Sequence, residues 1–217
     1  MAGIAAWIGI AAEGFGISAA VFAAAIILIA LGLHKTGAIV MLAALAIAIF
    51  FRDPDRFPNR TEGVVLSGAD GRVVEVSERE MPGMAGVRFN RVSVFMSPLN
   101  VHVNRAPIGG EVARIEYTAG SFRAAFRDDA SEHNERNLIV FKDSGGTMVG
   151  MMQIAGYLAR RIVCRLRVRD RIEPAQRIGL IMFGSRVDHF IPPQYRVTVS
   201  PGDRVRAGET VLGKLGQ

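Results

Sequence analysis

The 217-residue chain is long enough for one medium-sized domain with a buried core, and half of its residues are hydrophobic. Its formal net charge of +6 comes almost entirely from arginine, since only three of the 26 basic residues are lysines. The single cysteine, Cys164, excludes an intramolecular disulfide, and four scattered histidines argue against a clustered metal site.

The first 51 residues predict a membrane anchor. No charged residue occurs from 14 to 33 or from 36 to 51. A helix over 14–33 would be roughly 30 Å long, the thickness of a bilayer hydrocarbon core, and one over 36–51 would reach about 24 Å. We therefore expect two apolar helices joined near Lys35 as a transmembrane hairpin. A buried helical hairpin of a soluble protein is the alternative.

The arginines predict the orientation of this anchor. Arg52, Arg56 and Arg60 closely follow the second apolar segment, whereas no basic residue precedes the first. The positive-inside tendency then places the rest of the chain on the cytoplasmic face of the cell membrane. A basic domain attached to a membrane segment also favours anionic lipid over nucleic acid as its partner.

A mainly β domain is expected after a linker. Residues 52–60 are charged and interrupted by proline, which predicts a linker, and 61–217 then form one domain. In that domain, β-branched and aromatic runs alternate with turns rich in glycine and aspartate. The clearest expected strands lie at about 63–66, 72–76, 87–96, 101–103, 111–117, 138–141 and 148–154.

One short motif is repeated. Asp170–Gln176 recurs as Asp203–Glu209, 33 residues later, and each copy stands between strand-like runs. Such a strand-turn repeat is typical of barrel- or sandwich-like domains of the biotinyl- and lipoyl-carrier type. It predicts that β architecture but not carrier function. No lysine lies between Lys142 and Lys214 to hold biotin or lipoate.

An apolar strand beginning at Arg177 runs into Gly184 and Ser185 and resumes at Val187. Taken alone, a glycine–serine pair in a strand indicates little, because a bulge or tight bend explains most such pairs.

Five segments in order, over about 140 residues, resemble the phosphatidylserine decarboxylase family, and specifically its short, archaeal-type branch. They are similar to its anchor-to-domain segment, its Asp-Gly turn, its histidine segment, a further shared run and its processing site. The segments are Phe50–Arg56, Ser67–Val73, Ser97–Arg105, Asn134–Asn137 and Phe183–Asp188.

The resemblance implies a proenzyme that cleaves itself. The Ser185 hydroxyl would attack the carbonyl of Gly184, where glycine leaves room for the attack. Elimination of the resulting ester would release the chain that ends at Gly184 and leave dehydroalanine at residue 185. Loss of ammonia would then give a pyruvoyl group there. Two associated chains, 1–184 and 185–217, would result. A weak hydroxyl nucleophile needs a base and an orienting group, and the family pattern places His102 and Asp70 there.

The implied reaction converts phosphatidylserine to phosphatidylethanolamine and CO2, which makes the chain a carboxy-lyase. The pyruvoyl would bind the serine amine as a Schiff base and accept electrons, in place of pyridoxal phosphate and without a metal. His102 is the candidate proton donor, and Arg105 is a candidate contact for the lipid phosphate. Larger family members carry a second histidine where Arg105 stands. Either His102 serves both steps, or His133 or His189 assists.

Two other functions remain open. A pyruvoyl enzyme for another amino-acid head group is the rival among enzymes, and a membrane-tethered, carrier-like β binding module is the rival among binding proteins. Three lysines without a glycine-rich phosphate cradle argue against pyridoxal phosphate. The expected partners are phosphatidylserine in an anionic membrane and the two chains of one precursor, without nucleic acid. A homo-oligomer is compatible with the sequence.

Overall fold

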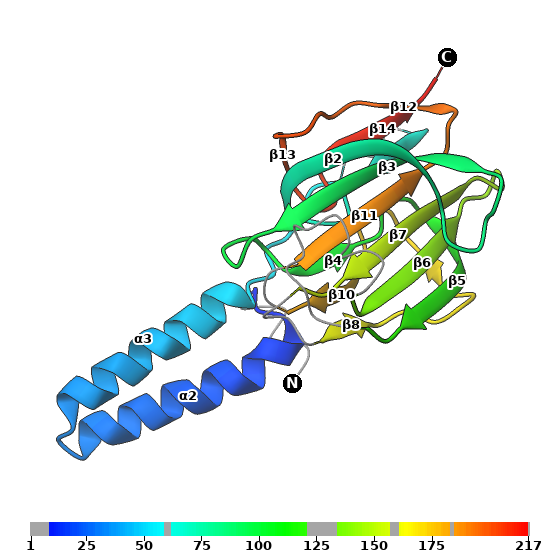
Figure 1. Ribbon diagram of the computed structural model, residues 1–217. Helices are drawn as coiled ribbons and strands as arrows, with labels where there is room; N and C mark the ends of the chain where they lie inside the picture. Colours follow the sequence, from blue (N-terminus) through cyan, green and yellow to red (C-terminus); the bar gives the residue numbers. More distant parts are fainter. Residues whose placement is uncertain (1–8, 59–61, 121–133, 157–160, 183–184, 217) are drawn as a thin grey trace. The chain divides into compact units, whose positions relative to one another are not determined.

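The computed structural model describes residues 9–58, 62–120, 134–156, 161–182 and 185–216, and the statements below concern these ranges. The chain divides into two compact units, one up to Asp55 and one from Arg56 onward, which are described separately. Figure 1 shows apolar helices in the first unit and strands throughout the second. The prediction of a mainly β chain with apolar N-terminal helices is confirmed.

The first unit contains two antiparallel helices, α2 (Ala12–Ala30) and α3 (His34–Phe50). Each begins two residues earlier than expected, and α2 stops where Gly32 adopts a φ of 82°. The helices pack closely at Gly37, where an added Cβ would lie only 2.5 Å from the Cγ1 of Ile29, so a larger residue would not fit there. Among the described helices, only α2 is long and apolar enough to cross a membrane. The transmembrane hairpin stays a prediction.

The second unit is built on a curled antiparallel sheet of eight strands, in the order β13-β2-β3-β11-β7-β6-β5-β9 (Figure 1). The strands, in that order, are β13 (Arg204–Val205), β2 (Gly71–Glu80), β3 (Arg88–Met96), β11 (Ser185–Ile191), β7 (Met148–Ile154), β6 (Arg136–Lys142), β5 (Gly110–Thr118) and β9 (Arg171–Ile172). The strand-rich segments that were expected from composition all lie in or overlap strands.

Two sheets of three strands complete the unit. The first consists of β1 (Val64–Leu66), β14 (Val211–Leu215) and β12 (Tyr195–Val197), and the second of β4 (Val103–Arg105), β10 (Arg177–Ile181) and β8 (Ile162–Cys164).

The central strands of the large sheet are buried on both faces. In β6, Ile139 and Phe141 belong to the main core cluster, whereas Leu138 and Val140 belong to a second, smaller cluster. Because side chains alternate along a strand, the two clusters lie on opposite faces of the sheet. This double burial explains why these strands are continuous apolar runs rather than alternating ones.

The repeated motif marks an internal pseudo-two-fold symmetry. Leu66 N–H donates to the Pro107 carbonyl (2.8 Å), and Arg105 N–H donates to the Gly68 carbonyl (2.9 Å), so the two copies exchange equivalent hydrogen bonds. The short strands β13 and β9 open the two repeats and pair with the first residues of β2 and β5, respectively. The sequence repeat is therefore a structural one.

The expected strand through residue 185 is wrong in one respect. β10 ends at Ile181 in a three-stranded sheet, and β11 begins at Ser185 in the eight-stranded sheet. The chain changes sheets between them, at the position of the expected cleavage. A continuous apolar run cannot reveal this change, because both strands are buried and need the same residue types.

Candidate functional site

The strand register brings the candidate residues to one end of the large sheet. Ser185, the first residue of β11, pairs with Met96, the last residue of β3. On the other side of β3, Arg72 pairs with Phe95, which places the start of β2 beside Met96. Asp70 immediately precedes β2. At about 4.8 Å between neighbouring strands, the backbones at Asp70 and Ser185 are roughly 10 Å apart.

Ser185 is completely buried. Its Oγ lies 3.4 Å from the Sδ of Met96, a weak hydrogen-bond acceptor that leaves the hydroxyl close to its intrinsic reactivity. Gly184, the other half of the expected cleavage site, lies outside the described residues. The sheet fixes the position of Ser185, while the preceding connection makes the change of sheet.

Asp70 is held by two strong contacts. One carboxylate oxygen accepts a hydrogen bond from the Ala207 backbone N–H, and the other accepts one from the Arg56 guanidinium, both at 2.7 Å. The Arg56 side chain is only 9% exposed and also approaches Glu209 at 3.5 Å. Arg56 therefore orients Asp70. Sequence reasoning took this arginine for a membrane-orienting charge and missed its role in the site.

His102 is 2% exposed and stands just before β4. Its Nδ1 lies 2.9 Å from the carbonyl oxygen of Asn100, which can only accept, so Nδ1 carries the proton and Nε2 is the basic nitrogen of the neutral ring. The turn before it is rigid, because the Asn100 side chain accepts hydrogen bonds from the backbone N–H (2.8 Å) and hydroxyl (2.7 Å) of Ser97. The His102 carbonyl accepts from the N–H of Ile181 (3.3 Å), near the end of β10.

The strand pairing and these hydrogen bonds place Ser185, His102 and Asp70 at the same end of the sheets. Ser185 contacts Met96, Asp70 contacts Arg56 and Ala207, and His102 contacts Asn100. All three residues are buried, with at most 8% of their surface exposed. The arrangement is a shielded polar centre beside the change of sheet.

A chain of buried amides leads to the Asp70 turn. Asn137 donates to Gln153 (3.0 Å), Gln153 donates to Asn104 (2.8 Å), and Asn104 donates to the Gly68 carbonyl (3.3 Å). All three amides are at most 2% exposed. Burying amides is costly unless they are hydrogen-bonded. This series of hydrogen bonds gives each of the three amides a partner and also fixes the turn before Asp70. Asn104 and Asn137 lie in two of the segments that resemble the family, but no local pattern in the sequence links them to Gln153.

His189 supports the same turn from β11. Its Nε2 accepts the Gly68 N–H at 2.8 Å, and its Nδ1 lies 3.3 Å from the Val92 carbonyl. Complete burial lowers the pKa of His189 to about 4, although the Val92 carbonyl and the Asp188 carboxylate oppose the shift. Both ring nitrogens are occupied in this structure, so His189 braces the Asp70 turn instead of standing ready as a base. His133, the other suggested assistant, lies outside the described residues.

We expect His189 to make the fold acid-sensitive. With a pKa of about 4 in the folded state and an ordinary value of 6.5, the unfolded chain binds more protons between these pH values. The group's stability contribution is therefore complete above pH 6.5 and is lost as the pH falls to 4, by about 3 kcal/mol in total. Thermal unfolding of the detergent-solubilised protein should lose this part of its pH dependence in His189→Gln. Equal slopes in variant and wild type would contradict the assignment.

A buried ion-pair network follows Ser185 on the other face of β11. Arg186 donates twice to the Asp188 carboxylate, at 2.7 and 3.0 Å, and Arg91 bridges Asp188 (3.8 Å) to Glu75 (2.6 Å). Burial would raise the pKa of Glu75, but hydrogen bonds from Arg91 and Ser77 and the positive charges nearby lower it on balance. The paired charges fix the first residues of β11 and, with them, Ser185.

Arg105 is 5% exposed, and its Nη1 donates to the Ala175 carbonyl at 3.1 Å. Its side chain also lies against Gly208, where an added Cβ would approach Arg105 Cδ to 3.0 Å. These contacts place Arg105 near the pseudo-two-fold axis. Its contact with a lipid phosphate stays a prediction.

The pseudo-symmetry supplies an internal comparison for the site. The pseudo-two-fold axis relates the candidate site to an equivalent place, where Gly63 corresponds to His102, Gly109 to Asp70 and Pro174 to Ala207. Proline has no N–H to donate, and glycine has no carboxylate to receive it. The Asp70–Ala207 hydrogen bond therefore breaks the symmetry. The equivalent turn forms without such a bond, so the fold alone does not require it.

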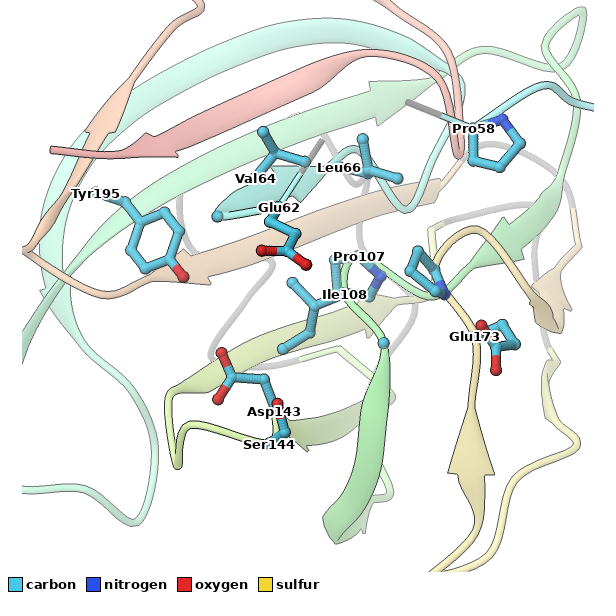
Figure 2. A pocket seen from close by; sticks show the side chains of 13 residues that line it. Pro58, Glu62, Val64, Leu66, Pro107, Ile108, Asp143, Ser144, Glu173 and Tyr195 are labelled. Atoms are coloured by element: carbon cyan, nitrogen blue, oxygen red, sulfur yellow. The ribbon is translucent and has the colours of Figure 1, made fainter. Parts of the chain in front are cut away.

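An open pocket of about 660 Å³ lies at the place that the pseudo-two-fold axis relates to the candidate site (Figure 2). Gly63, Gly109 and Pro174 line it, together with the side chains of Glu62, Asp143, Glu173 and Tyr195. Burial and the Asp143 carboxylate raise the pKa of Tyr195, partly offset by a hydrogen bond with Thr147. None of Ser185, His102 and Asp70 lines this pocket, so it is separate from the candidate site.

Comparisons with known proteins identify the family of the chain. The family model for phosphatidylserine decarboxylase matches residues 43–213. A phosphatidylserine decarboxylase proenzyme of Symbiobacterium thermophilum is 46% identical over 209 residues, covering 96% of each chain. Proenzymes of the same name from Desulfotalea psychrophila and Gluconobacter oxydans are 42% and 48% identical, covering 82% and 76% of this chain and 83% and 75% of their own. The chain therefore belongs to the phosphatidylserine decarboxylase family.

Proposed function

We propose that this chain is a proenzyme that cleaves itself between Gly184 and Ser185 and then decarboxylates phosphatidylserine to phosphatidylethanolamine. One observation carries the proposal: Ser185 begins a strand of the large sheet where the chain leaves another sheet, at the same end of the sheets as His102 and as Asp70, which Arg56 orients. The relatives' names support the substrate and the proenzyme.

In self-cleavage, the Ser185 hydroxyl is the nucleophile and Gly184 supplies the carbonyl carbon. Nε2 of His102 is the basic nitrogen available to take the hydroxyl proton. Asp70, held by Arg56 and the Ala207 N–H, places a fixed negative charge at this end of the sheet, which stabilises a protonated histidine. His102 thus serves both steps.

Ser185 fits the pyruvoyl group that the family uses. The group is made from the serine's own carbon atoms, so the buried position at the start of β11 already has room for it. When formed, it supplies an electron sink for loss of CO2 from the substrate's serine head group. Burial of Ser185, Asp70 and His102 excludes bulk water from the reacting atoms. His102 then returns a proton to the substrate carbon.

The setting of the enzyme is part of the proposal. The helices α2 and α3 anchor the chain in the cell membrane, and the domain from Arg56 onward lies on its cytoplasmic face. The two products of cleavage, 1–184 and 185–217, stay associated, because β11 pairs with both β3 and β7. The substrate is drawn from the same membrane.

Intact mass spectrometry of the purified, denatured wild-type protein tests the proposal. We expect two fragments that meet between Gly184 and Ser185, with the smaller one lighter than a serine-terminated peptide by the loss of ammonia. The same preparation should release CO2 from phosphatidylserine. A folded protein that remains a single chain would contradict self-cleavage, and a cleaved protein inactive on phosphatidylserine but active on another head group would replace the substrate.

A further inference from the structure

A strip of arginines lies on the connection between β8 and β9, beside the candidate site. The segment 161–171 contains five arginines and one acidic residue, Asp170, for a net charge of +4 out of +6 in the whole chain. All five side chains are exposed. The arginine strip consists of Arg161, Arg165, Arg167, Arg169 and Arg171.

The strip runs from the start of β8 to the start of β9, and apolar residues hold it to the domain. Ile162, Cys164 and Leu166 pack against the main core cluster, while Arg161, Arg165 and Arg167 beside them are exposed. Val168 and Arg169 then form a turn, in which Arg169 adopts a φ of 76°, and Arg171 begins β9. The backbone is fixed as well: Arg165 N–H donates to the Ile178 carbonyl (2.9 Å), and Arg169 N–H donates to the Val112 carbonyl (2.8 Å). The guanidinium groups therefore project from a rigid base.

The strip begins next to the catalytic centre. Met182 N–H donates to the Arg161 carbonyl at 3.2 Å, three residues before Ser185. In the three-stranded sheet, Ile181 lies between the two outer strands, bonded to the His102 carbonyl on one side and paired with Ile162 on the other. His102 and Arg161 are thus separated by about two strand spacings, roughly 10 Å.

Two exposed apolar side chains accompany these charges. Leu99 is 80% exposed on the rigid Ser97–Asn100 turn that leads into His102, and Val168 is 51% exposed within the strip. Basic side chains with protruding apolar ones are the combination by which proteins bind the surface of an anionic bilayer. Single apolar side chains are common on protein surfaces, so the charge carries the inference and the apolar residues support it.

We propose that the arginine strip docks the catalytic domain on anionic phospholipids, so that the bilayer surface meets the site at the His102 end of the sheet. This inference rests on the proposed function and adds a surface to it that is distinct from the N-terminal anchor. The complementarity is direct: the strip is cationic, and the substrate, phosphatidylserine, is itself an anionic lipid. Guanidinium groups also suit phosphate and carboxylate oxygens, which they can contact in pairs.

The test uses the full chain reconstituted into lipid nanodiscs with a low fraction of phosphatidylserine. The variant R165Q/R167Q/R169Q removes three charges of the strip, and R79Q/R88Q/R196Q removes three exposed arginines elsewhere as a matched control. With phosphatidylglycerol as the added anionic lipid, the strip variant should show an apparent KM for phosphatidylserine about tenfold above that of the control, because each basic residue adds to membrane affinity. The kcat should not change, and salt should weaken the wild type more than the strip variant.

The outcomes separate the docking from the chemistry. Self-cleavage and turnover of a monomeric, short-chain phosphatidylserine should be equal in all three proteins. Equal KM values for the strip and control variants would overturn the docking, as would a loss of activity on the monomeric substrate by the strip variant alone. Binding of RNA through the strip, with lipid kinetics unchanged, would also overturn it. A wild type that neither cleaves nor releases CO2 would instead refute the proposed function, and the docking with it.

Discussion

Ser185→Ala is expected to remain one uncleaved chain without decarboxylase activity. Alanine lacks the hydroxyl that attacks Gly184, and without cleavage no pyruvoyl can form at residue 185. The change removes one oxygen atom, whose contact in the structure is the weakly accepting Met96 sulfur. The fold should therefore survive, so that the loss reports on chemistry. Gel electrophoresis, intact mass and CO2 release measure it.

Ser93→Ala is the matched control for this experiment. Ser93 is also completely buried, and it lies on β3 opposite Asp188 of the same β11 strand. Its hydroxyl has no hydrogen-bond partner among the described residues, so its removal should cost little. We expect Ser93→Ala to cleave like the wild type. Cleavage at residue 185 in Ser185→Ala would show that another residue is the nucleophile.

Asp70→Asn is expected to slow self-cleavage by about 100-fold or more, the scale at which acid–base assistance contributes. The amide oxygen can still accept the Ala207 N–H, so the turn keeps its shape, but the negative charge next to Arg56 is lost. The rate of fragment appearance during cell-free synthesis measures the effect.

Glu209→Gln provides the control for Asp70→Asn. Both carboxylates contact Arg56, at 3.5 Å for Glu209 and 2.7 Å for Asp70, but only Asp70 also receives the Ala207 N–H. We expect Glu209→Gln to cleave at close to the wild-type rate. If the two substitutions slow cleavage equally, Arg56 and its carboxylates act through the stability of the linker and not through the site.

Local patterns account for what could be predicted. The strands follow from β-branched runs between turns, and the β architecture follows also from the repeat at Asp170 and Asp203, because each of these signals is contained in a few consecutive residues. Ser185, His102 and Asp70 were found through motifs that resemble a family. The structure brings them to one end of the sheets, while their roles stay proposals.

The remaining features depend on partners that are distant in sequence. Arg56 lies in a charged, proline-rich linker whose composition predicts exposure, and its burial depends on Asp70 and on Glu209, 153 residues away. The exchange of sheets between Ile181 and Ser185 is invisible because both strands are apolar. Arg186 would be expected at the surface, and only its two hydrogen bonds to Asp188 make its burial tolerable.

Because of where residues 185–217 lie in the fold, we expect the cleaved enzyme to refold less readily after unfolding than its uncut precursor. They supply β11 inside the large sheet, β13 at its edge, and β12 and β14 of a three-stranded sheet, where β14 is central. The uncut precursor folds as one molecule, but a mature enzyme whose fragments have separated must find its partner by collision, at a rate set by concentration. The lifetime of the active mature enzyme is then set by its rate of unfolding, which is a kinetic stability. An inactivated preparation should recover poorly on dilution, even where its precursor refolds readily.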